Sequence, residues 1–251
     1  MKKLRGLKEE LFLVRVFPEF PDVSAGFSHR PQGNMSLHHA DSQNALRDRR
    51  FFMNQLGIDF KRLVCAKQVH KDRVVCVSEK DVGQGALEYS KSLDDTDALV
   101  TDIRRLPVGV FTADCLSIFF YDPKTPAIGI AHAGWRSSTH KIAIKTLVAL
   151  QKNFGTLFRD VLVSFGPFLG PCCYEVKEDV REVFPQYTHS RGGKWFLDLA
   201  AVNCDQLLNV GVRAENIFIT GSCTSCNHAR YFSFRREGKV CGRMLSVIML
   251  R

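Results

Sequence analysis

The sequence has no uninterrupted apolar run long enough to cross a membrane. Its longest apolar runs, Gly109 to Ala113 and Cys115 to Tyr121, are separated by Asp114 and are much shorter than about eighteen residues. A signal-peptide pattern is also missing, because Arg15 interrupts the first apolar run and no small-residue cleavage site follows. We therefore expect a soluble, cytoplasmic protein with no membrane partner.

Acidic residues are in the minority, with 26 Asp and Glu against 35 Lys and Arg, for a formal net charge of +9. The charged fraction of 24% is ordinary for a folded domain, and 19 Phe are too many for a disordered chain. The basic residues are scattered, without a Lys/Arg-rich tail or an RNA-binding signature. We therefore expect no nucleic-acid partner, and an anionic small substrate accounts for some of the charge equally well.

The apolar pattern predicts an α+β fold with mixed sheets, because helices do not alternate regularly with strands. Length alone leaves the number of domains open, and we find neither a linker nor an internal repeat. The predicted helices are Ala45 to Leu56, Ile142 to Phe154, Glu178 to Phe184 and Leu199 to Asn209. The predicted strands are Leu11 to Phe17, Leu63 to Lys67, Arg73 to Ser78, Ala98 to Thr101, Val108 to Phe111, Leu116 to Tyr121, Ile128 to His132, Val161 to Phe165, Ile217 to Thr220, Tyr231 to Phe234 and Met244 to Leu250.

Three short segments concentrate reactive side chains next to predicted strands. They are Lys67 to His70, Thr112 to Cys115, and Ala131 to Arg136. The two imidazoles and one thiolate of His70, Cys115 and His132 suit zinc, and three protein ligands leave a fourth position for water, as in catalytic sites. Taken singly, each of these residues is more often structural. Their wide spacing excludes a zinc finger, so such a site needs the fold to assemble it.

The odd total of nine cysteines, most of them in apolar surroundings, is typical of reduced, buried side chains. Cys223-Thr224-Ser225-Cys226, with His228 and Cys241, resembles a second metal set, but a lone C-x-x-C is a weak signal. The neighbours Cys172 and Cys173 are too close for an unstrained disulfide. We interpret both groups as structural.

Further short motifs are spread along most of the chain. They are Gln68-Val69-His70, Ala113-Asp114-Cys115, His132 to Arg136, Gly166-Pro167 with Cys173 to Val176, Leu197 to Leu199, Cys223-Thr224 with Phe232 to Arg236, and Gly242-Arg243. Together they resemble the YfiH-like laccase-domain family, also described as purine nucleoside phosphorylases with adenosine deaminase activity. The resemblance implies one domain over residues 1–251 with a four-layer α/β/β/α arrangement of mixed sheets. This chain departs from the family pattern at Lys71, Ser117 and Ser137.

The resemblance also implies a zinc-dependent purine nucleoside enzyme, with His70, Cys115 and His132 as metal ligands and copper as the less favoured metal. Such an enzyme cleaves adenosine, inosine or methylthioadenosine with phosphate, and deaminates adenosine through a metal-activated water. The expected partners are therefore a small nucleoside and phosphate, and the oligomeric state stays open.

Catalytic and phosphate-binding roles can be assigned to further residues by type. Asp114, beside the metal ligand Cys115, is the candidate that moves a proton, and a role in orienting a ligand is an equal alternative. Arg30, Arg50 and Arg136 are candidates for holding phosphate, because a guanidinium fork matches phosphate geometry. The alternatives are that Arg30 and Arg50 cap or solvate the first helix and that Arg136 anchors the turn at Trp135.

Other functions stay open at this point. A peptidoglycan-precursor editing hydrolase, which the family also implies, would remove L-Ser from a UDP-muramyl intermediate with the same metal-activated water. A copper-dependent polyphenol oxidase would need many histidines, several in His-x-His pairs, whereas this chain has eight and no such pair. A non-enzymatic module that binds through its basic surface is the remaining alternative.

Overall fold

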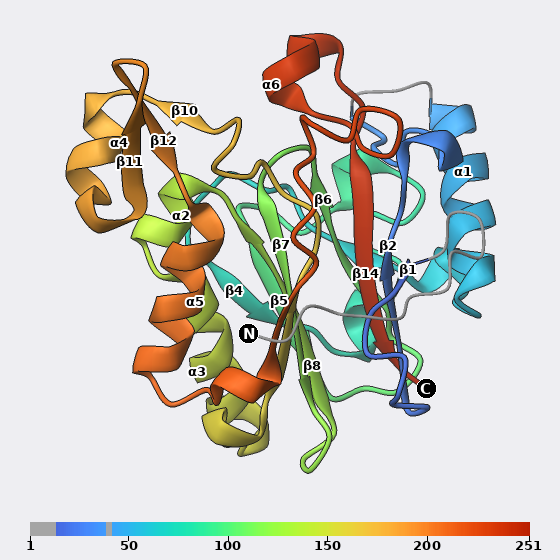
Figure 1. The fold of residues 1–251 in the computed structure, drawn as a ribbon. Coiled ribbons are helices and arrows are strands. Elements are labelled where there is room, and N and C mark those ends of the chain that lie inside the picture. The colour runs from blue at the N-terminus through green and yellow to red at the C-terminus, as the bar shows by residue number, and fades with distance from the viewer. Residues whose placement is uncertain (1–13, 39–41) are drawn as a thin grey trace.

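Two β-sheets lie face to face at the centre of the molecule (Figure 1). The structure is a computed structural model that describes residues 14–38 and 42–251. Within these ranges the first sheet has five strands in the order β1 (Val14–Arg15), β2 (Val23–Phe27), β14 (Met244–Leu250), β6 (Val108–Thr112) and β3 (Val64–Cys65). The second has six, in the order β13 (Ile217–Ile219), β9 (Leu162–Phe165), β7 (Leu116–Asp122), β8 (Ala127–Ala133), β5 (Ala98–Thr101) and β4 (Val74–Cys76). Antiparallel pairs predominate, but β3 with β6, β4 with β5 and β9 with β13 are parallel, so both sheets are mixed.

Helices cover the outer face of each sheet. α1 (Ser42–Gln55) contributes Phe52 to an apolar cluster that contains Leu245 of β14. α3 (Ile142–Phe154) and α5 (Leu199–Asn209) cover the second sheet on its opposite side. The predicted α+β content and the four-layer α/β/β/α arrangement are therefore confirmed.

Strand β7 explains why its sequence is an almost continuous apolar run. Ile118 and Phe120 pack toward the helices, whereas Phe119 and Tyr121 pack between the two sheets. Because both faces of this strand are buried, alternation with polar residues is lost. Ser117 is the exception, since its hydroxyl accepts a hydrogen bond of 2.8 Å from that of Ser246 on β14.

Strand β14 holds the first sheet together, because it pairs antiparallel with β2 on one side and β6 on the other. A smaller antiparallel sheet lies outside the two main layers. Its order is β10 (Glu175–Val176), β12 (Lys194–Leu197) and β11 (Thr188–Arg191), and α4 (Glu178–Val183) lies between β10 and β11 in sequence. The remaining short helices are α2 (Trp135–Thr139) and α6 (Phe234–Glu237).

Most predicted elements are present, and α3, α5, β5 and β14 have the predicted bounds. Residues 11–13 of the first predicted strand lie outside the described residues. The strand predicted for Tyr231 to Phe234 is wrong. There the Ser233 hydroxyl accepts a hydrogen bond from the backbone N–H of Arg236 and begins α6, so an N-cap outweighs the alternating aromatic pattern.

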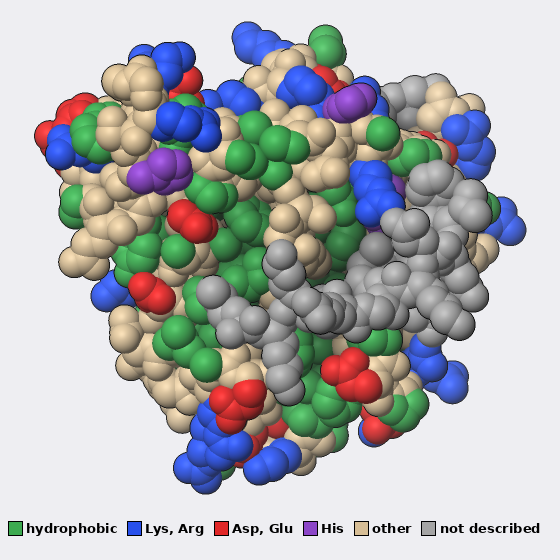
Figure 2. All heavy atoms as spheres, viewed as in Figure 1, with side chains coloured by type: hydrophobic (Ala, Val, Ile, Leu, Met, Phe, Trp, Pro, Cys, Tyr) green, Lys and Arg blue, Asp and Glu red, His purple; other side chains and the backbone are tan. Residues whose placement is uncertain are grey.

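On the face shown in Figure 2, Lys and Arg side chains are spread around the edge of the molecule and do not gather in one patch. Within the described ranges, no helix combines the length and the apolar character needed to cross a bilayer.

Candidate functional site

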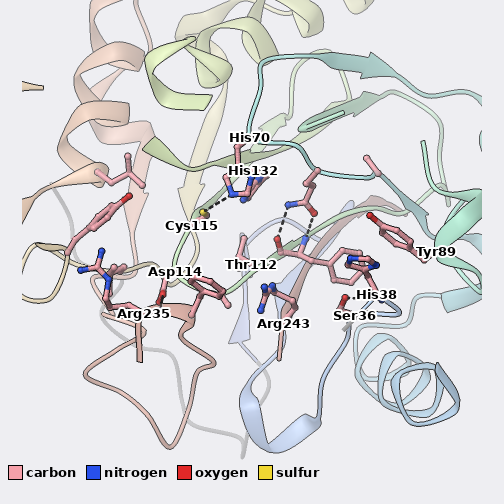
Figure 3. A pocket seen from close by; sticks show the side chains of 18 residues that line it. Ser36, His38, His70, Tyr89, Thr112, Asp114, Cys115, His132, Arg235 and Arg243 are labelled. Atoms are coloured by element: carbon pink, nitrogen blue, oxygen red, sulfur yellow. Dashed lines mark hydrogen bonds between the residues drawn. The ribbon is translucent and has the colours of Figure 1, made fainter. Parts of the chain in front are cut away.

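His70, Cys115 and His132 come together where β7 begins and β8 ends. His70 lies in the loop after β3, Cys115 in the loop between β6 and β7, and His132 near the end of β8. Their ligand atoms all lie within 4.8 Å of one another, and Cys115 Sγ is 3.7 Å from His70 Nε2. The two imidazole rings meet edge to face, with centroids 4.6 Å apart. The fold therefore assembles one cluster from three distant segments (Figure 3).

Asp97, directly before β5, orients both histidines. Its Oδ1 accepts hydrogen bonds from His132 Nδ1 at 2.8 Å and from the His70 backbone N–H at 3.0 Å. Its Oδ2 accepts from the backbone N–H groups of Lys71 and Val69. Because a carboxylate only accepts, His132 Nδ1 is the donor, and Nε2 is left for the cluster.

Burial would raise the pKa of Asp97, but its hydrogen bond with the ring of His132 and the backbone N–H groups hold that pKa below its ordinary value. The carboxyl group is fully buried, yet because these hydrogen bonds lower its pKa it stays ionised at neutral pH. Its ionised form keeps the two histidines in place.

Cys115 and His132 form a charge pair. Burial alone would raise the pKa of the Cys115 thiol, but the neighbouring imidazoles of His132 and His70 lower it to about 6. Burial likewise opposes the charged form of His132, yet Cys115 and Asp97 raise the pKa of its ring to about 9. The thiol is therefore a thiolate at neutral pH, the form that binds metals.

Gly134 closes one side of this cluster. A β-carbon at this position would lie 3.0 Å from His70 Cδ2 and 3.1 Å from Cys115 Sγ. The backbone N–H of Gly134 donates to the Ser137 hydroxyl at 3.1 Å, which fixes the chain at the start of α2. Glycine thus leaves the space that the cluster occupies.

The other side of the cluster faces a cavity of about 460 Å³. Its lining includes the aromatic side chains of Tyr89, Phe111, Tyr174 and Phe234. The rings of His38 and Tyr89 are stacked with centroids 4.5 Å apart. In Figure 3 this stacked pair lies at the opposite end of the cavity from Asp114 and Arg235, with Arg243 between the two ends.

Asp114 lines the cavity, but its carboxylate oxygens are directed to the C-terminal part of the chain. Oδ1 accepts from the Thr224 hydroxyl and Oδ2 from the backbone N–H of Arg235, both at 2.6 Å. The residue has a φ of +95°, which is rare for aspartate. These two bonds hold the strained turn and fix the start of α6 beside the cluster.

The three arginines predicted to hold phosphate do not line this cavity. Arg30 Nη1 forms an ion pair of 2.6 Å with Glu237, Arg136 stacks 4.3 Å from the centroid of a Trp135 ring, and Arg50 is exposed on α1. The arginines in the lining are Arg235 and Arg243. Arg235 lies 5.6 Å from the Tyr174 ring centroid, and Arg243 Nη1 donates to the carbonyl of Cys241 at 2.7 Å.

Sequence reasoning missed Asp97, which orients the cluster, and the cavity residues His38, Tyr89 and Arg243. For Asp97 a signal was present. The available signal was an acidic residue placed directly before a short, fully buried strand, Ala98–Thr101. Arg235 directly follows the segment Tyr231 to Phe234 that was wrongly predicted as a strand, so its place beside Asp114 was missed as well.

A family model, a relative in sequence and a solved structure each match most of the chain. A family model described as "Multi-copper polyphenol oxidoreductase laccase" matches residues 20–251. Over 250 residues the chain is 33% identical to purine nucleoside phosphorylase YlmD of Geobacillus stearothermophilus, covering 92% of this chain and 91% of that protein. It is 32% identical over 203 residues to adenosine deaminase RL5 of an unknown prokaryotic organism, covering 77% of each. The crystal structure of YlmD from Geobacillus stearothermophilus superposes with a TM-score of 0.92 at 31% identity, covering 97% of this chain and 98% of that one.

Proposed function

Because the chain belongs to the family described as multi-copper polyphenol oxidoreductase laccases, and is similar over most of its length to a purine nucleoside phosphorylase, we propose that it is a zinc-dependent purine nucleoside enzyme. Its reactions are phosphorolysis of adenosine, inosine or methylthioadenosine, and deamination of adenosine. The observation that carries this proposal is a cluster of two histidines and one cysteine in the wall of a cavity that also contains two arginines.

The donor set fits zinc. Two imidazole nitrogens and a thiolate are ligands that zinc accepts, and three protein ligands leave one position toward the cavity. Gly134 also fits this role. A β-carbon at this position would press against His70 and Cys115, so glycine leaves both side chains free to take up the geometry of metal ligands. His70, Cys115 and His132 would hold the zinc ion, which would act as a Lewis acid and lower the pKa of water toward about 7.

Copper oxidase chemistry fits these residues less well. A multi-copper enzyme needs several centres that are rich in histidine. In the described part of the chain, the other group of side chains arranged for a metal consists of four cysteines and contains no histidine. This composition favours nucleoside chemistry over oxidation of phenols.

The chain's own side chains can position a nucleoside. The His38–Tyr89 stack and Phe111 offer flat apolar surfaces to a purine ring. The cavity volume of about 460 Å³ falls within the range of about 300–1,000 Å³ typical of small-ligand sites. Deamination needs the base near Cys115, and phosphorolysis needs the ribose beside a bound phosphate.

Arg235 and Arg243 replace Arg30, Arg50 and Arg136 as our proposed phosphate ligands, because their side chains line the cavity. Asp114 acts as a positioning residue, since its carboxylate holds the backbone N–H of Arg235. Its role in proton transfer is thereby less favoured than its role in shaping the site.

The test is chromatography of adenosine, inosine and methylthioadenosine incubated with and without phosphate. Release of base should require phosphate, whereas formation of inosine from adenosine should not. Arg235→Gln and Arg243→Gln should each raise the apparent KM for phosphate about 10- to 100-fold, as expected for loss of a charge-assisted hydrogen bond of about 1.5–3 kcal/mol. Arg136→Gln is the matched control and should leave that KM unchanged.

Two results would contradict the proposal. If saturating phosphate releases no base, the phosphorylase assignment fails, and hydrolysis of a UDP-muramyl precursor carrying L-Ser becomes the next assay. If both arginine variants keep the wild-type KM for phosphate, the cavity arginines do not hold this substrate.

A further inference from the structure

Four cysteines form a second cluster that is separate from the first. Cys172 and Cys173 lie in the turn after β9, and Cys223 and Cys226 in the turn after β13. Their sulfur atoms all lie within 4.8 Å of one another. His228 and Cys241, which the sequence placed with Cys226, are not in this group. The fold therefore joins two pairs that the sequence presents as unrelated.

The sulfur separations fit a tetrahedral shell around one ion. Cys226 Sγ lies 3.6 Å from Cys172 Sγ and 3.4 Å from Cys173 Sγ. Four thiolates at about 2.3 Å from a zinc ion are about 3.8 Å apart along each tetrahedral edge. A disulfide would require about 2.0 Å, and all four cysteines are free. The tight grouping also leaves no room for the larger core of an iron–sulfur cluster.

Backbone hydrogen bonds hold the two turns in this arrangement. The Thr224 backbone N–H donates to the carbonyl of Phe168 at 2.9 Å, and the Gly170 backbone N–H lies 3.4 Å from Cys223 Sγ. Within the first turn, the Cys173 N–H donates to the Gly170 carbonyl at 2.9 Å. An N–H group directed at a sulfur stabilises its thiolate form. The ligands are thus brought together by the fold before any ion binds.

We propose that Cys172, Cys173, Cys223 and Cys226 bind one zinc ion in a closed, four-thiolate structural site. Zinc is favoured because it prefers tetrahedral thiolate shells, and a shell filled by four protein ligands leaves no position for a substrate. The proposal stands independently of the nucleoside activity proposed above.

The ion would connect two walls of the active cavity. The turn that carries Cys172 and Cys173 is flanked by Leu169 and Tyr174, which line the cavity. The other turn contains Thr224, whose hydroxyl holds Asp114. Zinc at the four cysteines would therefore fasten the two turns that shape the site, without touching the substrate.

The experiment uses the full chain with Cys115→Ala, which removes a ligand from the first cluster and leaves the second intact. Elemental analysis should find one zinc ion per chain after desalting, and X-ray absorption should find four sulfur neighbours at about 2.3 Å. Cobalt substitution should give an intense sulfur-to-metal charge-transfer band. Adding Cys226→Ser should remove the zinc and weaken the band, whereas adding Cys76→Ser, at an exposed cysteine on β4, should change neither.

Three results would overturn the proposal. They are a Cys115→Ala protein that is folded and holds no metal, an ion with fewer than four sulfur neighbours, and a disulfide within the group found by peptide mass mapping. If the variant with Cys226→Ser fails to fold, the measurements on Cys115→Ala alone decide the question. Activity enters none of these readouts, so a failed nucleoside assay leaves the test intact.

Discussion

The two clusters differ in how many ligands the chain supplies. His70, Cys115 and His132 offer three candidate ligands, and the cluster faces a cavity with two arginines. The four-cysteine cluster brings together four sulfur atoms from two turns, the number that the proposed tetrahedral zinc shell needs. A metal held by three protein ligands keeps a position for substrate, whereas a metal held by four only supports the fold, whichever metal is bound.

The clusters also differ in how they balance charge without an ion. Cys115 has His132 beside it, so a thiolate forms at neutral pH. In the other cluster the thiols neighbour one another, and burial together with the nearby Cys223 and Cys226 sulfurs raises the pKa of Cys172. Like charges repel there, so full ionisation of the four thiols needs a cation. The first cluster therefore contains a thiolate before an ion binds, whereas full ionisation of the second cluster requires a bound ion.

The largest expected difference is between Cys115→Ala and Cys226→Ala. Cys115→Ala should lower kcat/KM at least about 10⁴-fold, as for loss of a group on which turnover depends, with little change in Tm. Cys226→Ala should keep kcat/KM within a few-fold of wild type and lower Tm by at least about 4 °C, which corresponds to 1–2 kcal/mol in a chain of this size. Steady-state kinetics and calorimetry check both. Equal loss of activity in two folded variants would end the division of roles.

The next largest effect is the pH dependence of zinc binding at the first cluster. Between pH 6 and 9 Cys115 is already a thiolate, but His132 carries a proton that zinc must displace. Affinity should therefore rise about tenfold per pH unit across this range and level off above pH 9. Below pH 6 a second proton, on Cys115, should steepen the dependence. Competition with a chromophoric chelator on Cys226→Ser protein measures this slope, and a flat profile would contradict the charge pair.

A smaller effect on zinc affinity should distinguish the two carboxylates beside the first cluster, Asp97 and Asp114. Asp97→Asn should weaken zinc binding about 10- to 100-fold, the usual cost of losing a carboxylate that orients a histidine ligand. Asp114→Asn should leave zinc affinity near wild type and raise the KM for phosphate, because its carboxylate holds Arg235 and Thr224. Metal titration and phosphate kinetics on both proteins separate the roles, and a larger zinc defect in Asp114→Asn would reverse them.

The smallest effect on zinc binding is expected from substitution of the glycine beside each cluster. A β-carbon at Gly134 would lie 3.0 Å from His70 Cδ2, whereas at Gly170 its nearest neighbour would be Cys223 Cβ at 3.3 Å. Gly134→Ala should therefore weaken zinc binding a few-fold, and Gly170→Ala should leave the zinc content of both clusters unchanged. Metal analysis after a graded chelator wash checks this order. The opposite order would mean that the four-cysteine cluster is the tighter fit.

Sequence reasoning could find His70, Cys115 and His132 because each lies in its own short motif beside a strand. It could not find Asp97, because the role of that carboxylate exists only once the loop from Val69 to Lys71 folds over it. Arg30, Arg50 and Arg136 were predicted to hold phosphate but do not line the cavity, and the reason is similar. Nothing in the sequence shows that Glu237 pairs with Arg30 across the fold.

The same limit applies to the fold. Apolar periodicity predicted α3 and α5 with their observed bounds, since each has a one-sided stripe and a clear end. Strand β2, with the sequence Val-Ser-Ala-Gly-Phe, was missed because its buried serine and glycine weaken the apolar signal. The four-cysteine cluster was missed because it depends on the parallel pairing of β9 with β13, which brings distant turns together.

The position of β14 also bears on how the protein forms on the ribosome. β2 and β6 both pair with β14 and not with each other, so the first sheet stays in two pieces until residues 244–250 have been synthesised. Until then each piece has an open edge that can pair with strands of other chains. Nascent chains that stop before Met244 should therefore need chaperones to prevent these edges from pairing with other chains. Once β14 is synthesised, it pairs with both edges and the need ends.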